Sequence, residues 1–165
     1  MKHLILIGLP GSGKTTAGKA LAKELHLPFS DCDDAVEQAA QMTIPEIFRR
    51  EGEPGFRARE TAALRTLTTL PCRVIACGGG VVTVPANRQL LRTGFAVLWH
   101  RSPEDIMSTC QLTGRPLLEN TTLAQLYRQR LPLYRAWADA TVDAGDFEAA
   151  VARTAALWRE KSCDF

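Results

Sequence analysis

The chain has 165 residues, of which 45% are hydrophobic, so it has the size and composition of one globular domain with its own core. Its formal net charge is only +2 and its basic residues are scattered among acidic ones, which argues against a nucleic-acid-binding protein with a concentrated basic face. The five cysteines are odd in number and include no CxxC pair, which indicates reduced thiols rather than a disulfide framework or a zinc site.

Strand and helix patterns alternate along the chain. Short apolar runs that end at glycine or at polar residues are typical of buried strands in a parallel sheet. We expect five such strands, at residues 3–7, 28–31, 73–77, 95–99 and 141–143. Apolar residues at helical spacing predict helices at residues 16–25, 34–40, 57–70, 85–92, 122–131 and 147–161.

Capping residues mark the starts of several helices. We expect Asp33 or Asp34 to cap the helix of residues 34–40. Thr43 opens a capping box and Ser102 precedes a proline and two carboxylates, so each starts a further helix. The alternation of five strands with helices predicts an α/β fold with one five-stranded parallel sheet flanked by helices.

The first strand is followed by a phosphate-loop motif, G-x-x-x-x-G-K-[ST], at residues 8–15. Glycines in such a loop let backbone N–H groups turn towards phosphate oxygens, and the following helix adds the positive end of its dipole. Lys14 can bridge the outer phosphates, and Thr15 offers a hydroxyl to Mg²⁺. The motif predicts that ATP is held by Gly11, Ser12, Gly13, Lys14, Thr15 and Thr16.

Two aspartates, Asp31 and Asp33, follow the second strand, at the edge of the sheet where parallel α/β folds bind ligands. Being two residues apart, they point the same way in an extended segment. One carboxylate can hold Mg²⁺ through water, and the other can accept the proton of a phosphoryl acceptor. The alternative is that both carboxylates only cap the next helix, and the spacing alone does not decide between the two.

A longer series of motifs is more specific than the phosphate loop. It consists of residues 8–15, Asp31-x-Asp33, residues 44–48 (IPEIF), residues 55–60 (GFRARE), Cys77 followed by Gly78–Gly80, residues 114–118 (GRPLL) and residues 130–134 (RLPLY). In this order, over most of the chain, the series resembles the shikimate kinases, P-loop small-molecule kinases that are related to the nucleoside monophosphate kinases.

The resemblance implies a three-layer P-loop kinase fold with a five-stranded parallel sheet. It also implies a lid at about residues 112–122 and a flap that binds the acceptor at about residues 33–60. The reaction that it implies is transfer of the γ-phosphate of ATP to the 3-hydroxyl of shikimate. The products would be shikimate 3-phosphate and ADP, in the chorismate pathway of aromatic amino-acid biosynthesis.

The resemblance also implies roles for individual residues. Asp33 matches the aspartate that binds the acceptor hydroxyls and is the candidate base, and Asp31 matches the residue that reaches Mg²⁺ through water. Arg57 and Arg130 match the family residues that bind the acceptor carboxylate. The planar guanidinium group of arginine suits a carboxylate better than the ammonium group of lysine does. The residues implied to bind the acceptor are Asp33, Arg57, Gly79, Gly80 and Arg130; those implied in catalysis are Lys14, Asp33 and the lid residue Arg115, which contacts the ATP phosphates; those implied to hold the metal are Thr15 and Asp31.

Two residues depart from the family pattern. Cys32 stands between the paired aspartates, where threonine or serine is usual. Thr109 stands where many members carry an arginine, at the end of the helix before the lid. The second departure bears on how strongly the lid side holds phosphate.

Other functions compete with this interpretation. A gluconate or nucleoside monophosphate kinase shares the phosphate loop and a lid, but Arg57, Arg130 and the triple glycine favour a carboxylated polyol over a nucleotide as the acceptor. A P-loop switch protein would need an Asn-Lys-x-Asp segment, which the sequence does not contain. A non-catalytic relative is the third alternative. The intact site residues argue against it: Lys14, Thr15, Asp31, Asp33 and Arg115.

The sequence also yields expectations about organisation and partners. We expect a single P-loop kinase domain over residues 1–165, acting as a monomer on small-molecule substrates, with no nucleic-acid or membrane partner. The first apolar run is too short for a signal peptide, and no run approaches the roughly 20 residues that cross a bilayer, so we expect a cytoplasmic protein. Mg²⁺ is the expected cofactor and ATP the expected co-substrate.

Overall fold

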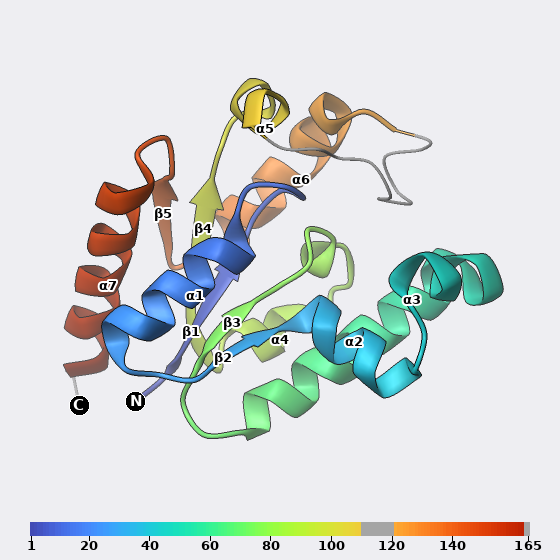
Figure 1. The fold of residues 1–165 in the computed structure, drawn as a ribbon, viewed down its shortest axis with the longest axis horizontal. Helices are drawn as coiled ribbons and strands as arrows, with labels where there is room; N and C mark the ends of the chain where they lie inside the picture. The colour runs from blue at the N-terminus through green and yellow to red at the C-terminus, as the bar shows by residue number, and fades with distance from the viewer. Residues whose placement is uncertain (110–120, 164–165) are drawn as a thin grey trace.

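In the computed structural model, residues 1–109 and 121–163 are described. Their five strands form one parallel sheet, as the sequence predicted, and the strand order is β2-β3-β1-β4-β5 (Figure 1). The strands are β1 (His3–Ile7), β2 (Phe29–Asp31), β3 (Val74–Ala76), β4 (Gly94–His100) and β5 (Ala140–Asp143).

Helices cover both faces of the sheet. On one face lie α1 (Lys14–Leu25) and α7 (Phe147–Cys163), and on the other lie α3 (Ile44–Thr69), α4 (Asn87–Leu91) and α6 (Leu123–Trp137) (Figure 1). The central strand β1 is buried throughout because successive side chains enter opposite cores: Leu4 and Leu6 join the core with α1 and α7, whereas Ile5 joins the core on the other face. The α/β fold predicted from the alternating pattern is confirmed, with helices on both faces of the sheet giving three layers.

The second helix, α2 (Cys32–Ala40), begins two residues earlier than expected, and the prediction that Asp33 or Asp34 caps it is wrong. Asp31 is the cap: its Oδ1 accepts hydrogen bonds from the backbone N–H groups of Asp33, at 2.8 Å, and Asp34, at 3.3 Å. Because Asp31 ends β2 in an extended conformation, the chain can turn into the helix directly after it.

The two helices expected between Thr43 and residue 70 follow one another within a single element, α3. They are separated by a break at Gly52, where φ is 70°. Thr43 caps its start, since its Oγ1 accepts from the backbone N–H of Glu46 at 3.3 Å. The capping box is only half made, because the Glu46 carboxylate pairs with Arg49 and Arg50 instead. The break at Gly52 changes the direction of the chain just before the segment that carries Arg57.

The helix α6 extends further than the sequence suggested. It was expected to end at Leu131, but it continues through Pro132 to Trp137. Tyr134 is only 1% exposed, and burial of this large side chain favours continuing the helix past the proline. Two short helices complete the described chain, the 3₁₀ helix η1 (Val81–Thr83) and α5 (Pro103–Thr109).

None of the helices within residues 1–109 and 121–163 has both the length and the hydrophobicity required to cross a membrane.

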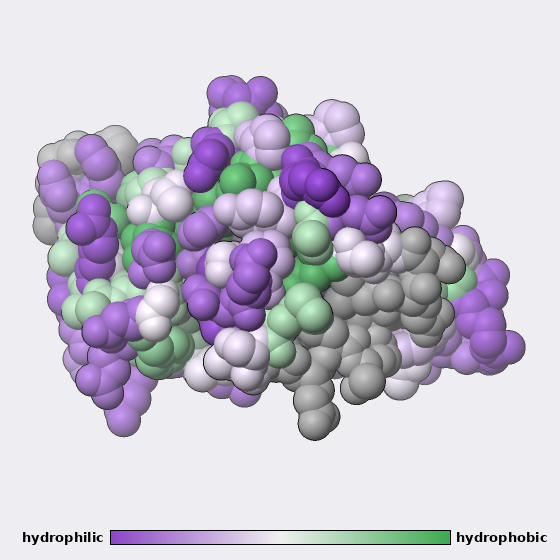
Figure 2. Space-filling model, turned by 90° about the horizontal axis from the view of Figure 1, so that it is seen from above, coloured by the Kyte–Doolittle hydropathy of each residue, from purple (hydrophilic) through white to green (hydrophobic). Residues whose placement is uncertain are grey.

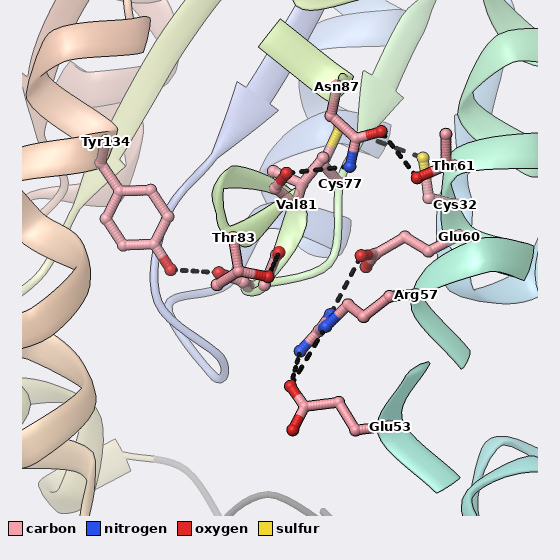
Figure 3. A network of polar contacts seen from close by, with 12 residues as sticks. Cys32, Glu53, Arg57, Glu60, Thr61, Cys77, Val81, Thr83, Asn87 and Tyr134 are labelled. Carbon is pink, nitrogen blue, oxygen red and sulfur yellow. Dashed lines mark hydrogen bonds and ion pairs between the residues drawn. The ribbon is translucent and has the colours of Figure 1, made fainter. Parts of the chain in front are cut away.

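A buried amide ties three of these elements together. Asn87 is fully buried; its Nδ2 donates to the carbonyl of Val81 at 2.9 Å, and its Oδ1 accepts from the hydroxyl of Thr61 at 2.8 Å (Figure 3). It therefore joins η1 and α3 at the base of α4.

We expect Asn87→Ala to lower the free energy of unfolding by about 2–4 kcal/mol, because it leaves a buried carbonyl and a partly buried hydroxyl without partners. Urea unfolding followed by circular dichroism measures the loss. Gln89→Ala is the matched control: this amide is exposed on the same helix, so the change should stay within about 0.5 kcal/mol. Equal losses in the two variants would contradict the role given to Asn87.

Candidate active site

The phosphate loop connects β1 to α1 and has the backbone that its glycines permit. Gly8, Gly11 and Gly13 have φ values of 151°, 76° and 89°, which residues with side chains rarely adopt. Lys14 is the first residue of α1 and is only 7% exposed. Its Nζ donates to the carbonyls of Gly8, at 2.8 Å, and Leu9, at 2.7 Å, which places the ammonium group within the loop.

The next residue of the loop contacts the end of β2. The hydroxyl of Thr15 donates to Oδ2 of Asp31 at 2.6 Å, while the other oxygen of this carboxylate caps α2. Asp31 is thus both a helix cap and a partner of the phosphate loop, so the two interpretations of its carboxylate do not exclude each other. No cluster of three or more His, Cys, Asp or Glu residues suited to a metal occurs within the described ranges.

The triple glycine after β3 lies where several of the predicted site residues meet. A Cβ on Gly78 would lie 2.6 Å from Oε2 of Glu60 and 3.0 Å from Oδ1 of Asp33, and a Cβ on Gly79 would lie 2.6 Å from the ring of Pro10. A Cβ on Gly80 would overlap the guanidinium of Arg57. The turn therefore contacts the phosphate loop, α2 and α3 at once.

Arg57 enters this turn from α3 and is only 8% exposed. Its Nη1 donates to Oε1 of the buried Glu60 at 3.0 Å, and its Nη2 and Nε each lie 3.3 Å from Oε1 of the half-exposed Glu53 (Figure 3). Its guanidinium carbon lies 5.2 Å from the centre of the Phe56 ring. Glu60, three residues further along the same helix, therefore orients Arg57, and Glu53 adds a second carboxylate for which the sequence gave no signal.

Two buried atoms beside the turn lack hydrogen-bond partners among the described residues: Nη1 of Arg130 and Oε2 of Glu60. Arg130 projects from α6 and is 5% exposed. Burial raises the pKa of the Glu60 carboxyl above its usual value, and the charges of Arg57 and Arg130 only partly oppose the shift. A donor and an acceptor are thus available for a polar ligand.

Tyr134, one turn beyond Arg130 on α6, donates its hydroxyl to the carbonyl of Gly79 (Figure 3). Burial raises the pKa of Tyr134 to about 12, against the opposing charge of Arg130, so the hydroxyl stays protonated and remains a donor at neutral pH. The sequence contained Tyr134 in a motif but assigned it no role, because nothing in the local pattern links it to a glycine 55 residues earlier.

Cys32 and Cys77 form a second contact that the sequence did not indicate. Both thiols are buried, with Cys32 Sγ donating to Cys77 Sγ at 3.9 Å, directly behind the triple glycine. The hydrogen bond to Cys77, burial and the carboxylates of Glu60 and Asp33 raise the pKa of the Cys32 thiol well above its usual value. In place of the usual hydroxyl residue, Cys32 therefore acts as a small buried side chain.

A cavity of about 410 Å³ lies on the opposite side of the phosphate loop. Its lining includes loop residues 11–13 and Thr16, together with Trp99, Arg101, Thr109 and Phe147. Figure 2 views the molecule from the side where the strands end, and hydrophilic side chains predominate there with hydrophobic ones between them. Trp99 is only 1% exposed and packs in the core, and it also borders this cavity.

Some predicted residues are not part of this constellation. Arg115 and lid residues 112–120 lie outside the described residues, and only the end of the expected lid, Thr121 and Thr122, is described. Thr122 caps α6 with a complete capping box. Arg59, two residues from Arg57, pairs instead with Glu51, away from the turn.

Comparison with known proteins agrees with this arrangement. The shikimate kinase family profile matches residues 10–158. The chain belongs to the shikimate kinase family. A shikimate kinase of Thiobacillus denitrificans is 47% identical over 150 residues, which cover 86% of this chain and 80% of that protein. One from Pseudomonas paraeruginosa is 47% identical over 149 residues, or 87% of each chain.

The solved structures give the same result. The structure of a shikimate kinase from Acinetobacter baumannii in complex with shikimate matches with a TM-score of 0.88 and 36% identity, over 98% of this chain and 93% of that chain. The family resemblance predicted from the motifs is confirmed, and with it the enzyme class, an ATP-dependent kinase. Family membership also excludes the switch-protein alternative.

The raised pKa of Glu60 gives a pH dependence whose sign can be tested. A carboxyl whose pKa is higher in the folded state than in the unfolded state stabilises the fold below the unfolded pKa, and this contribution is lost as the pH rises through the folded pKa. Glu60→Gln keeps an acceptor for Arg57 but cannot ionise. We expect the stability of the wild type relative to Glu60→Gln to fall as the pH rises above about 4, measured by urea unfolding. A relative stability that rises with pH would mean that pairing with Arg57 outweighs burial.

Tyr134→Phe should disturb the acceptor side of the site. Without the hydroxyl, the Gly79 carbonyl loses its donor and the glycine turn is no longer fixed. We expect kcat/KM for the acceptor to fall by about 3- to 10-fold, with a much smaller change in the KM for ATP. The control is Tyr127→Phe on the same helix, whose hydroxyl lies 3.0 Å from Nε2 of His100 and away from the turn. Equal effects on both substrates would contradict a positioning role for Tyr134.

Proposed function

We propose that the chain transfers the γ-phosphate of ATP to the 3-hydroxyl of shikimate, giving shikimate 3-phosphate and ADP. The observation that carries this proposal is the position of the Gly78–Gly80 turn. It touches the phosphate loop at Pro10 on one side and the buried Arg57 on the other. A phosphate donor held by the loop and an anionic acceptor held by the arginine would therefore meet at the turn.

The acceptor's chemistry fits the atoms that lack partners. Shikimate carries a carboxylate and hydroxyl groups on a ring. The buried Nη1 of Arg130 can donate to the carboxylate, together with Arg57, and Oε2 of Glu60 can accept from a hydroxyl. Phe48 and Phe56, whose rings lie 4.8 Å apart beside Arg57, offer an apolar surface for the carbon ring. The backbone N–H groups of Gly79 and Gly80 complete the acceptor side.

Transfer requires an in-line approach and neutralisation of the charge that develops on the phosphate. Lys14 and the loop N–H groups would hold the outer phosphates, and the lid residue Arg115 would add a second cation. Asp33, whose Oδ1 lies close to Gly78, is positioned to accept the proton from the attacking hydroxyl. Positioning and charge neutralisation then supply most of the rate enhancement.

Mg²⁺ is the metal that the site would take. Thr15 and Asp31 present two hard oxygen donors that already lie 2.6 Å apart at the loop. Mg²⁺ commonly binds through one or two protein oxygens together with phosphates and water, so two protein residues suffice. The metal would neutralise phosphate charge, while Thr15 and Asp31 would keep it on the β2 side of the loop.

We extend the proposal to the organisation of the molecule. A single domain comprises residues 1–165, with the lid at about residues 112–122 and the acceptor-binding segment at about residues 33–60. The protein acts as a monomer in the cytoplasm on shikimate and ATP. Size-exclusion chromatography with light scattering tests the oligomeric state.

A coupled assay of ADP release tests the function. We expect release to require shikimate and Mg²⁺ together, with gluconate and nucleoside monophosphates inactive. In the same assay, Arg57→Lys and Arg130→Lys should raise the KM for shikimate by about 10- to 100-fold with little effect on the KM for ATP, because each variant keeps its charge but loses the planar fork.

Arg59→Lys is the matched control for the arginine variants. Arg59 lies two residues from Arg57 but pairs with Glu51 at 2.7 Å instead of entering the turn, so both KM values should stay unchanged. Release of ADP with gluconate but not with shikimate would overturn the proposed acceptor. A rise in the KM for ATP alone would assign Arg57 and Arg130 to the nucleotide.

A further inference from the structure

The strand order fixes the side on which the nucleoside of ATP lies, if the proposed function holds. The phosphate loop follows β1, which lies between β3 and β4. On the β3 side, Pro10 of the loop packs against Gly79 and the acceptor residues; on the β4 side, Gly8 lies close to the carbonyl of Trp99. Since the γ-phosphate must face the acceptor, the adenosine extends towards β4 and β5.

The cavity of about 410 Å³ occupies this second side. It begins at residues 11–13 of the loop and reaches the segment after β5, with Trp99 and Phe147 in its wall. The rings of Trp99 and Phe147 meet edge to face, with centroids 6.0 Å apart. Its position and its partly aromatic wall suit a purine base.

Arg101 is the one charged side chain among the described residues that line this cavity. It follows β4 directly, and its side chain runs along α5. Its Nη2 donates to the carbonyl of Asp105 at 2.8 Å and to Oγ1 of Thr109 at 2.7 Å. Oγ1 of Thr109 in turn lies 3.0 Å from the same carbonyl. Two anchors therefore fix the guanidinium plane beside the cavity.

The geometry of these anchors leaves a surface for a ligand. Both bonds are made by Nη2, so within the described residues Nε, Nη1 and the flat faces of the guanidinium make no hydrogen bond. A planar cation with fixed orientation stacks well on an aromatic ring. We propose that Arg101 is a nucleotide-binding residue whose guanidinium packs on the purine base of ATP, and that Thr109 is the positioning residue that holds it.

This assignment gives a reason for the departure at position 109. Where many relatives carry an arginine, this chain has a threonine whose hydroxyl anchors an arginine that comes from position 101 instead. An arginine side chain thus still lies beside the cavity in this chain. It comes from Arg101, directly after β4, and not from position 109, at the end of α5.

Calorimetric titration of the purified protein with Mg·ATP, in the absence of any acceptor, tests the assignment. We expect Arg101→Ala to weaken ATP binding about tenfold, and Arg101→Lys to weaken it nearly as much, because lysine keeps the charge but has no plane. Thr109→Val should weaken binding by about two- to threefold, since it removes one anchor. Arg153→Ala, which removes an exposed arginine from α7, is the matched control and should bind like the wild type.

Salt distinguishes a contact with the base from a contact with phosphate. A stacked guanidinium is screened little, so the loss in Arg101→Ala should be about the same at roughly 0.05 M and 0.5 M NaCl. Full rescue by Arg101→Lys, or a loss that disappears at high salt, would show that Arg101 neutralises phosphate and would overturn the base contact. Unchanged ATP affinity in Arg101→Ala would overturn any nucleotide role.

The test is independent of the proposed reaction. If shikimate is not phosphorylated but Arg101→Ala still loses ATP affinity, the proposed acceptor fails and the role of Arg101 stands. If shikimate is phosphorylated and ATP affinity does not depend on Arg101, only the role of Arg101 fails. Shikimate KM measured in parallel should be the same in Arg101→Ala and the wild type, which also confirms that the variant is folded.

Discussion

The absence of side chains at three consecutive positions, Gly78 to Gly80, is the constraint on which the rest of the site depends. The space that three Cβ atoms would occupy is taken by Pro10 of the phosphate loop, by Arg57 and by the carboxylate of Glu60. Any larger residue in the turn would displace one of these groups. The phosphate loop and Arg57 can therefore both approach the turn only because its three residues have no side chains.

The buried charges around this turn carry a cost that the free protein does not fully offset. Arg57 and Glu60 pair at 3.0 Å, but burial still raises the pKa of Glu60, so pairing compensates only part of the desolvation. Nη1 of Arg130 and Oε2 of Glu60 each lack a partner within the described chain, at a cost of about 1–3 kcal/mol for a buried polar group. A ligand with a carboxylate and a hydroxyl satisfies both, so binding and relief of this cost are the same event.

Much of the fold and part of the site could be predicted from the sequence because they depend on local patterns. The strands follow from short apolar runs, the phosphate loop from a fixed spacing, and the contact of Glu60 with Arg57 from positions i and i+3 on one helix. The cap of α2 was misassigned by two or three residues, because several nearby aspartates can each cap a helix and only the end of β2 decides among them.

The rest could not be predicted because it depends on contacts between distant segments. Tyr134 meets Gly79 across 55 residues and Cys32 meets Cys77 across 45, through the packing of α6 and the pairing of β2 with β3. Thr109 is a clearer case still. The sequence identified it as a missing arginine, whereas the structure identifies it as the anchor of another arginine, eight residues earlier.

The order of the strands explains why one loop can serve two substrates. In the sheet, β3 and β2 lie on one side of β1, and β4 and β5 lie on the other. The loop after β1 therefore stands where the direction of strand addition reverses. Asp33, Arg57 and the glycine turn, which we propose hold the acceptor, gather on the β2–β3 side, and the cavity with Arg101 lies on the β4–β5 side. The phosphate loop borders both: its Pro10 lies against Gly79, and its residues 11–13 line the cavity. A phosphate chain that lies across the loop would therefore direct its nucleoside end and its γ-phosphate to opposite halves of the sheet. The nucleoside and the acceptor would then occupy separate pockets, while the γ-phosphate meets the acceptor hydroxyl.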